Sequence, residues 1–289
     1  NHSPLLFSSR DTPCLAWLDE NTFKRIQLST SQQQSQLINI GQNRFAFELN
    51  WSSQSRSDHQ HLSQLLNDTN ISQTTQFIEP RKALHVLHSN QPLLDSNLNG
   101  EFRYFAKGRA LLHFHRTHQY CGVCGGQTEL TKEGLHRTCT QCSHEIYPRI
   151  EPAVIMLIVH PDHKHVLLGR QSQWPTGMWS ALAGFVDHGE TLQEAVVREV
   201  KEESSLPVDI NSLQFVSSQP WPFPISLMLG FIGHASAHHI QVDQHELSEA
   251  RWFSKDEVIA LLERSHKELF IPPPYAIANH LMQSWVTNS

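Results

Sequence analysis

Short hydrophobic runs and amphipathic stretches follow one another along the second half of the chain. The run 153–159 is uniformly apolar, and the turn sequence His160-Pro161-Asp162 separates it from a second run at 164–169. Continuous apolar runs of this length predict strands that are buried on both faces. Helical periodicity and capping signals predict helices among them. The expected elements are strands at 153–159, 164–169 and 227–232, and helices at 191–204, 254–263 and 276–285. This mixture predicts an α/β or α+β domain over 150–289.

The first half of the chain has a less regular pattern. Residues 1–118 alternate apolar patches with polar stretches, and we expect an α+β domain there, without visible chemistry. At its end, Phe105, Arg109, Leu112 and Arg116 recur at helical spacing. They predict a helix that leads into a short cysteine-rich segment, residues 119–149. The chain is therefore expected to have three domains, at 1–118, 119–149 and 150–289.

Composition narrows the class of protein only slightly. The 289 residues carry a formal net charge of −6, which argues against a protein that coats nucleic acid by bulk electrostatics but allows a local basic patch. The longest apolar run has seven residues, whereas a membrane-spanning helix needs about 20. We therefore expect no membrane segment. Five cysteines are too few for a disulfide scaffold in a chain of this length, which favours a cytoplasmic location.

Four of the cysteines form two close pairs. Cys121 and Cys124 are separated from Cys139 and Cys142 by fourteen residues. Each pair places two thiolates within reach of one ion, and the two pairs together can complete a tetrahedron. We expect a structural zinc ion here, because four protein ligands leave no position for water. Two disulfides, which a reducing cytosol disfavours, and iron in the same sulfur cage are the alternatives.

A second concentration of ligand groups lies on the first helix expected in the C-terminal domain. Glu199, Glu202 and Glu203 are three or four residues apart, so their carboxylates crowd one side of a helical turn. Such a pattern usually means a solvated acidic face. Here Arg198 is spaced to pair with Glu202, and a glycine-bearing loop, 184–190, comes directly before the helix. Hard oxygen ligands at this density suit Mg²⁺ or Mn²⁺ bound together with substrate phosphates, which indicates phosphate chemistry.

An unusual string, Ser218-Gln219-Pro220-Trp221-Pro222-Phe223-Pro224-Ile225-Ser226, lies further downstream. Because proline fixes the backbone, we expect a rigid loop that presents flat aromatic faces and a few hydrogen-bonding groups. Such a surface suits an aromatic heterocycle. The alternative is a stiff edge connection whose Trp221 packs in a core or a dimer interface, and residue types alone favour that alternative.

The glycine loop and the carboxylate helix resemble the signature of the Nudix hydrolases. The positions that match are Gly184, Glu190, Arg198, Glu199, Val200, Glu202, Glu203 and Leu206. The one departure is Ser205, where the family has a glycine that ends the helix; we expect activity to survive, since this position shapes backbone and binds no metal. The four-cysteine module and the string 218–226 are similar to those of the NADH pyrophosphatases, the NudC-type branch of the family. The resemblance is specific from about Arg109 to Ala278 and weak before it.

This resemblance implies a Nudix α/β/α sandwich domain preceded by a zinc ribbon, and it implies roles for particular residues. Divalent metals, Mg²⁺ or Mn²⁺, are expected on Glu199, Glu203, Glu246 and the backbone carbonyl of Ala183, with Glu202 as a further ligand or support. Glu203 is the strongest candidate for the residue that orients or deprotonates the attacking water. The substrate contacts implied for this chain are Tyr147, Phe185, Gln219, Trp221, Ser226 and Ala278. Phe185 is expected to stack on nicotinamide opposite Trp221 of a partner subunit, in a homodimer.

The function implied by the resemblance is hydrolysis of the pyrophosphate bond of NADH or NAD⁺, giving AMP and nicotinamide mononucleotide, together with removal of NAD caps from RNA. Two alternatives stay open. One is a Nudix hydrolase of another dinucleoside diphosphate such as ADP-ribose. The other is a zinc-ribbon RNA-binding module whose Nudix domain only grips ligands, although the intact carboxylates argue against it. The sequence leaves open the preference among the three NAD substrates, the phosphorus atom attacked and the role of residues 1–118.

Overall fold

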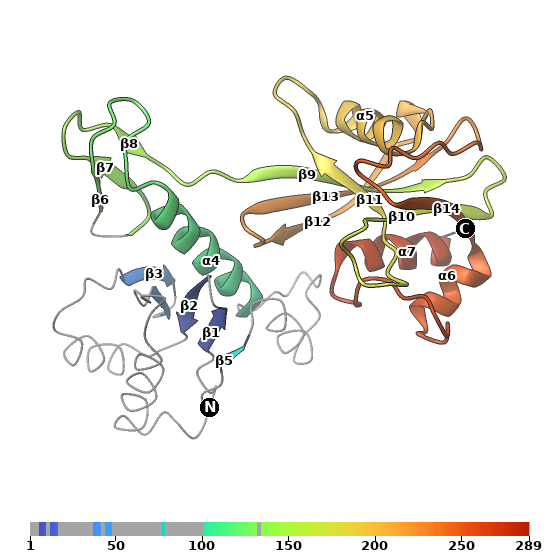
Figure 1. The fold of residues 1–289 in the computed structure, drawn as a ribbon, viewed down its shortest axis with the longest axis horizontal. Coiled ribbons are helices and arrows are strands. Elements are labelled where there is room, and N and C mark those ends of the chain that lie inside the picture. The colour runs from blue at the N-terminus through green and yellow to red at the C-terminus, as the bar shows by residue number, and fades with distance from the viewer. Residues whose placement is uncertain are drawn as a thin grey trace. The chain divides into compact units, whose positions relative to one another are not determined.

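The computed structural model describes residues 101–288 except 132–133, and nearer the N-terminus it describes the backbone of five short strands (Figure 1). These strands form a sheet of order β2-β1-β5 and a separate β3-β4 pair. Most of the region 1–118 lies outside the described residues, so its expected α+β fold stays a prediction. The five strands are β1 (Leu6–Ser9), β2 (Thr12–Ala16), β3 (Leu37–Gly41), β4 (Arg44–Phe47) and β5 (Phe77–Ile78).

The chain divides into two compact units, one made of residues 1–149 with 222–225 and one made of residues 150–221 with 226–289. The first unit contains the predicted helix, α4 (Glu101–Thr117), on which Phe105 and Leu112 are buried. After α4 comes a small antiparallel sheet of order β6-β7-β8, with strands β6 (Thr128–Leu130), β7 (Arg137–Cys139) and β8 (Glu145–Ile146).

A buried histidine links α4 to this small sheet. His115 is 2% exposed, and its Nε2 donates to the carbonyl oxygen of Gly134 at 2.9 Å. Burial lowers the pKa of His115 to about 4, so the imidazole is neutral at physiological pH. The contact therefore fastens the helix to the cysteine module with an uncharged hydrogen bond.

The second unit is built on a mixed sheet of six strands. Its order is β12-β13-β9-β10-β14. β10 pairs with residues 158–159 of β9, and β11 pairs with residues 153–156 on the same side of β9. β13 runs parallel to β9 and the other pairs are antiparallel. The strands are β9 (Glu151–Val159), β10 (His165–Arg170), β11 (Leu182–Phe185), β12 (Gln214–Trp221), β13 (Ser226–His234) and β14 (Glu249–Ser254).

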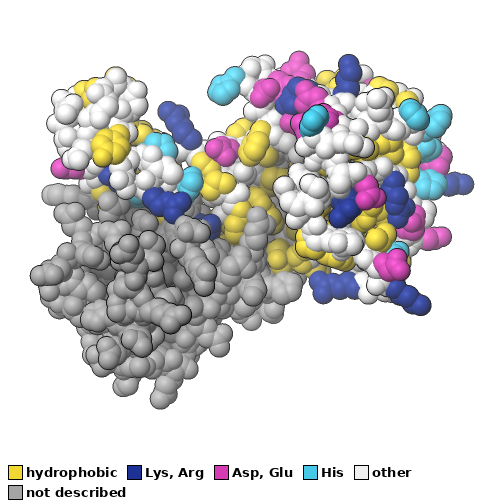
Figure 2. All heavy atoms as spheres, in the orientation of Figure 1, with side chains coloured by type: hydrophobic (Ala, Val, Ile, Leu, Met, Phe, Trp, Pro, Cys, Tyr) yellow, Lys and Arg dark blue, Asp and Glu magenta, His cyan; other side chains and the backbone are white. Residues whose placement is uncertain are grey.

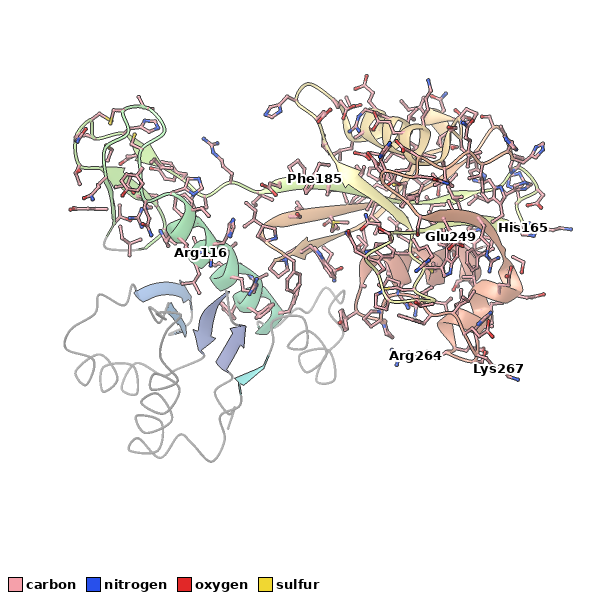
Figure 3. All side chains as sticks on the ribbon, viewed as in Figure 1. Arg116, His165, Phe185, Glu249, Arg264 and Lys267 are labelled. Atoms are coloured by element: carbon pink, nitrogen blue, oxygen red, sulfur yellow. The ribbon has the colours of Figure 1, made fainter. Side chains whose placement is uncertain are left out.

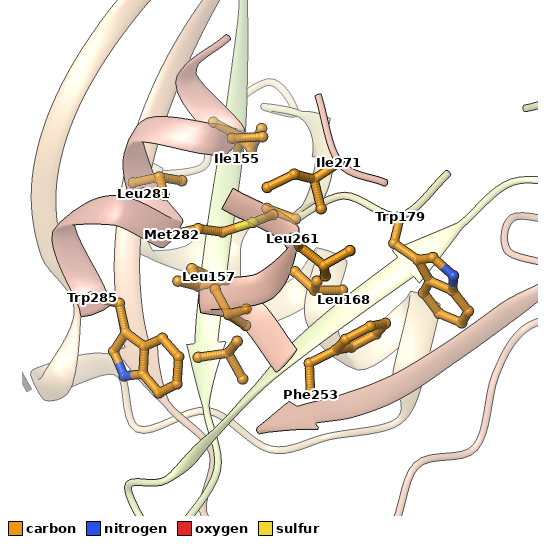
Figure 4. Close-up of a cluster of buried hydrophobic side chains, with 14 of the residues drawn as sticks. Ile155, Leu157, Leu168, Trp179, Phe253, Leu261, Ile271, Leu281, Met282 and Trp285 are labelled. Atoms are coloured by element: carbon orange, nitrogen blue, oxygen red, sulfur yellow. The ribbon is translucent and has the colours of Figure 1, made fainter. Parts of the chain in front are cut away.

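Helices cover both faces of this sheet, α5 (Leu192–Ser204) on one side and α6 (Lys255–Leu262) with α7 (Ile277–Asn288) on the other (Figure 1). Alternate residues of β9 serve the two layers. Val154 and Met156 pack in the cluster under α5, whereas Ile155 and Leu157 pack with residues of α6 and α7 (Figure 4). Both faces of β9 are therefore removed from water, which is why its sequence is uniformly apolar. The predicted α/β/α sandwich is confirmed. No described helix is long and apolar enough to cross a bilayer.

The strands and helices predicted for this unit are present, but the predicted loop at 218–226 is wrong for most of its length. Ser218 to Trp221 belong to β12, Ser226 opens β13, and only Pro222–Ile225 form the turn. β12 lies at the edge of the sheet, where a proline is tolerated because one side of the strand needs no hydrogen-bond donors. The prolines are therefore compatible with an edge strand and do not require a loop.

Candidate active site

Local capping and packing fix the position of α5. The hydroxyl of Thr191 accepts a hydrogen bond from the backbone N–H of Glu194, and the carboxylate of Glu194 accepts one from the backbone N–H of Thr191. This capping box, Thr191 with Glu194 three residues later, sets the first turn of the helix. Ala195, Val196 and Val200 are fully buried against the sheet. The rotation of the helix about its axis is thus determined.

The glycine before the helix is required by close packing. The carboxylate of Glu199 occupies the space in which a Cβ atom at position 184 would lie, so only Gly184 allows β11 to approach the helix this closely. Glu199 is itself buried, and burial raises the pKa of its carboxyl although the neighbouring Arg198 opposes that shift. Ala183, whose carbonyl is a predicted metal ligand, lies next to Gly184 on β11. That ligand role stays a prediction.

Arg198 connects the loop to the carboxylates of the helix. Its Nε and Nη2 donate to the two carboxylate oxygens of Glu190, at 2.6 and 2.9 Å. Its Nη1 donates to Glu199 and to Glu202, each at 2.9 Å, and Nη2 also donates to the carbonyl oxygen of Phe185 at 2.8 Å. The predicted pair with Glu202 is confirmed. The bidentate partner Glu190, whose pKa the guanidinium lowers, was seen in the sequence only as a motif position.

Three carboxylates converge beside this network. Glu199, Glu203 and Glu246 each offer an oxygen atom, and these oxygens lie within 4.8 Å of one another. Glu203 is 4% exposed, and its Oε2 has no hydrogen-bond partner in the described part of the chain. Burial, followed by repulsion from Glu199 and Glu246, raises the pKa of Glu203 to about 8. Such a group is unfavourable as an anion until a cation compensates it, and hard oxygen donors fit a divalent metal ion. Acidic and basic side chains are interleaved over this helix in Figure 2.

Glu246 belongs to the loop between β13 and β14, which is hydrogen-bonded to the end of α5. The backbone N–H of Gln241 donates to the carbonyl of Ser204 at 3.0 Å, and that of Asp243 donates to the carbonyl of Glu203 at 3.2 Å. These bonds occupy carbonyl groups that a helix leaves unpaired at its C-terminus. The side chain of Glu246 is exposed, so the three-carboxylate group is open to solvent on one side.

The other acidic residues lie elsewhere. Glu202 is not a member of the three-carboxylate group and is engaged by Arg198. Glu249 pairs with Arg170 at 3.1 Å and starts β14 (Figure 3). The supporting role expected for Glu202 therefore has a geometric basis, whereas its role as a direct ligand stays a prediction.

The residues expected to contact substrate have different surroundings. Phe185 is 56% exposed at the end of β11, and Figure 3 shows it at the margin of the sheet. Trp221 is half-buried at the end of β12 and is directly paired with buried Ser226. Tyr147 lies in the first unit, where its hydroxyl donates to Glu145 at 2.8 Å. Of the two aromatic residues of the second unit that are expected to contact substrate, Phe185 is therefore more exposed than Trp221.

Gln219 has a structural contact that residue type did not reveal. It is 1% exposed; its Nε2 donates to the carbonyl of Tyr275 at 2.8 Å, and its Oε1 accepts from the backbone N–H of Ile277 at 2.9 Å. The amide therefore ties β12 to the start of α7, where Ala278 is also buried. Gln219 and Ala278 position this end of the unit, and any contact of theirs with substrate stays a prediction.

The four thiols of the cysteine module face one another. Their sulfur atoms lie within 4.8 Å of one another, with separations of 3.3 Å for Cys124–Cys142 and 3.8 Å for Cys121–Cys142. A disulfide needs about 2.05 Å, whereas sulfurs on a tetrahedral zinc ion, with bonds of about 2.3 Å, stand about 3.8 Å apart. All four are free thiols, so the disulfide alternative is excluded for these residues.

The backbone of the module favours thiolates. Amide groups of Cys142 and Gln141 lower the pKa of the Cys139 thiol to about 6, and the N–H of Val123 donates to the sulfur of Cys121 at 3.4 Å. A thiolate is the form that binds metal. Gly125, at φ +75°, allows the backbone turn after the first pair of cysteines. The arrangement is that of a zinc ribbon.

Comparisons with known proteins agree with both sites. Residues 149–272 match the NUDIX domain, and residues 116–147 match the NADH pyrophosphatase zinc ribbon domain. The NAD-capped RNA hydrolase NudC of Escherichia coli O1:K1 / APEC is 37% identical over 202 residues, which cover 70% of this chain and 73% of that protein. The human NAD-capped RNA hydrolase NUDT12 is 37% identical over 220 residues, 73% of this chain and 47% of that protein. The chain thus spans about half the length of its NUDT12-type relatives.

The sandwich and its carboxylate helix define a Nudix domain, a class in which such a helix binds divalent metal. With the zinc ribbon before it and the identity to the NudC proteins, the chain belongs to the NudC-type branch of the Nudix hydrolases.

Proposed function

We propose that the chain hydrolyses the pyrophosphate bond of NADH or NAD⁺ to AMP and nicotinamide mononucleotide, and that it also removes NAD caps from RNA. The observation that carries this proposal is the open group of Glu199, Glu203 and Glu246 around an uncompensated buried carboxylate. Relatives named NAD-capped RNA hydrolases, at 37% identity, support the choice of substrate.

The residues of the site divide the catalytic work. Glu199, Glu203 and Glu246 would hold Mg²⁺ or Mn²⁺, which neutralises phosphate charge and lowers the pKa of a bound water. Glu203, whose pKa burial and the neighbouring carboxylates raise to about 8, becomes an anion once a metal compensates its charge, and it then orients or deprotonates the attacking water. Arg198 keeps the loop and the helix together, so that these carboxylates stay in register. Glu202 supports Arg198 from the solvent side.

Recognition of the dinucleotide would rest on aromatic rings. Phe185 is exposed and flat, and it is placed on the strand that leads into the carboxylate loop. In the proposed homodimer it stacks on nicotinamide opposite Trp221 of the partner subunit. Ser226 and Tyr147 would add polar contacts. The zinc ribbon would carry one structural zinc ion and no catalytic role, because all four of its ligand positions are filled by thiols.

One competition experiment tests the substrate. NADH, NAD⁺, NAD-capped RNA and ADP-ribose are offered to the same preparation with Mg²⁺ or Mn²⁺, and kcat/KM is measured for each. We expect the three NAD substrates to be preferred over ADP-ribose by at least ~tenfold, and AMP to be a product. Preference for ADP-ribose would favour the other Nudix activity, and no turnover on any diphosphate would favour a module that only binds.

A further inference from the structure

A third cluster of metal-ligating side chains, separate from the cysteines and the carboxylates, lies on the turn between β9 and β10. His160, Asp162 and His165 each offer one ligand atom, and these atoms lie within 4.8 Å of one another. Figure 3 shows His165 at the opposite end of the second unit from Phe185. The segment is predicted from sequence only as a turn, although it has the spacing His-x-Asp-x-x-His. The cluster has no part in the proposed reaction.

Asp162 brings the ligand atoms of the cluster together, because its two carboxylate oxygens face one nitrogen of each histidine. Asp162 Oδ2 lies 2.7 Å from His165 Nδ1, and Asp162 Oδ1 lies 2.9 Å from His160 Nδ1. The same His160 nitrogen accepts the backbone N–H of Asp162 at 3.1 Å. If this nitrogen carries no proton, two lone pairs face each other across 2.9 Å, an arrangement that a proton or a metal ion between them relieves.

The turn that carries these ligands is held by its own backbone. The N–H of His160 donates to the carbonyl of His165, and the N–H of His163 donates to the carbonyl of His160, both at 2.9 Å. The N–H of Lys164 donates to Asp162 Oδ1 at 2.7 Å. The ring of His160 packs edge-on against Trp252, with centroids 4.7 Å apart. Ligands fixed in this way lose little conformational entropy when an ion binds.

We propose that His160, Asp162 and His165 form a separate binding site for a borderline transition-metal ion such as Ni²⁺, Zn²⁺ or Cu²⁺. Two imidazole nitrogens and one carboxylate oxygen suit these ions and do not suit Mg²⁺, which demands oxygen ligands. Three protein ligands leave coordination positions for water or for a neighbouring side chain. The ring of His238 is one such neighbour, with its centroid 6.3 Å from that of His160. Histidine side chains also gather at this end of the unit in Figure 2.

The test is a calorimetric titration of the full chain with Ni²⁺, with the ribbon loaded with zinc and Mg²⁺ in excess to occupy the carboxylates. We expect about one equivalent of Ni²⁺ to bind. His165→Gln and Asp162→Asn should each weaken the affinity at least ~tenfold, since each removes one of three ligands. Asparagine keeps the oxygen that accepts from Lys164, so this variant keeps the hydrogen bond of the turn. His280→Gln, a histidine on α7, is the matched control and should bind as the parent does.

Two results would overturn the proposal. One is the absence of any Ni²⁺ binding. The other is Ni²⁺ binding that Glu246→Gln weakens and that His165→Gln and Asp162→Asn leave unchanged, which would place the ion on the carboxylates. Melting temperatures measured without Ni²⁺ verify that each variant is folded. In the parent, added Ni²⁺ should raise the melting temperature, and it should do so less in Asp162→Asn.

Discussion

The zinc ribbon and the three-carboxylate group both gather anionic ligands, but they assemble them differently. The ribbon takes four thiols from one segment, 121–142, and surrounds them with backbone donors. The carboxylates come from α5 and from a loop more than forty residues after it, and one of them, Glu246, is exposed. The first arrangement is closed by its own ligands. The second leaves one side open for water and phosphate.

The ionisation of the two groups differs as well. In the ribbon, backbone amides lower the pKa of Cys139 to about 6, so one thiolate is stabilised before metal binds. The backbone of His144 also favours the thiolate of Cys142, but the neighbouring cysteines and burial raise its pKa to about 12, so this thiol needs the metal to ionise. Burial and neighbouring carboxylates raise the pKa of Glu203 to about 8, so the active site leaves its anion uncompensated. A site of the first kind contributes metal-binding energy to folding. A site of the second kind gains metal-binding energy only when a cation binds together with the substrate.

The largest effect is expected from Cys139→Ser. Removing one of four thiolates from a closed site should release the zinc and unfold the ribbon, because the binding energy of such a site is also folding energy. Elemental analysis should show about one zinc per parent chain and none in the variant, and proteolysis should cut the variant within the ribbon. A parent chain without zinc, together with a variant of equal stability, would remove the claim.

Glu203→Gln should affect chemistry and spare the fold. The amide keeps the size of the side chain and loses the charge that holds metal and accepts a proton, so kcat should fall at least ~10²-fold, which is about 2.7 kcal/mol. The melting temperature should not fall, because a neutral group replaces a buried acid. Glu249→Gln, which removes only a partner of Arg170, is the control and should change kcat by less than ~twofold. Turnover by Glu203→Gln near that of the parent at saturating metal would refute the role.

Trp221→Ala separates recognition from chemistry. An aromatic contact with nicotinamide contributes about 0.5–1.5 kcal/mol beyond buried area, so KM for NADH should rise roughly tenfold, with a much smaller rise for ADP-ribose. Phe215→Ala removes an exposed ring from the same strand and should leave both KM values unchanged. Equal losses on both substrates, with a lower melting temperature or a smaller mass in solution, would assign Trp221 to packing or to the dimer interface.

The fold was predictable where one physical constraint dominates. The apolar run of β9 and the capping box of α6 each have a single explanation, and both elements are found where the sequence places them. The string 218–226 was misread because prolines are compatible with a loop and with an edge strand, and only the neighbouring strands decide between the two. The pairing of β12 with β13, which shows that 218–221 is a strand, cannot be seen in the sequence of this segment alone.

The candidate site was predictable to a similar extent. Spacing along one helix placed Glu199 and Glu203 on one side, whereas Glu246 followed only from the family resemblance. Hydrogen bonds from the 241–243 loop to the end of α5 bring Glu246 to the helix. The amide of Gln219 was assigned to substrate, yet its partners are backbone groups at the start of α7. Contacts between distant segments were the part that sequence could not supply.

The pKa of Glu203 predicts a pH dependence that Glu203→Gln should remove. The folded pKa, about 8, lies above the unfolded value of 4.5, so the folded chain holds a proton that the unfolded chain releases. This contribution to stability is fully present below pH 4.5 and is lost as pH rises through 8. Without added divalent cation, the parent should lose about 1 kcal/mol more than Glu203→Gln between pH 6 and pH 7, in urea unfolding. Parallel pH profiles would contradict the shift.

The smallest effect concerns the departure from the Nudix signature at the end of α5. Ser205 has φ 59° and ψ 14°, a left-handed conformation that a side chain with a Cβ atom adopts at a cost. Ser205→Gly should therefore raise the free energy of unfolding by about 0.5–1 kcal/mol, reduced somewhat by the greater freedom of glycine in the unfolded chain. Ser205→Ala keeps the Cβ atom and the strain, so it should give no such gain and is the matched control.

Because position 205 shapes backbone and the carboxylates lie on the preceding turn, kcat should stay within ~twofold of the parent in both variants. Urea unfolding of the three proteins at one pH measures the difference, and equal stability of the glycine and alanine variants would show that backbone strain at this position has no effect on the fold.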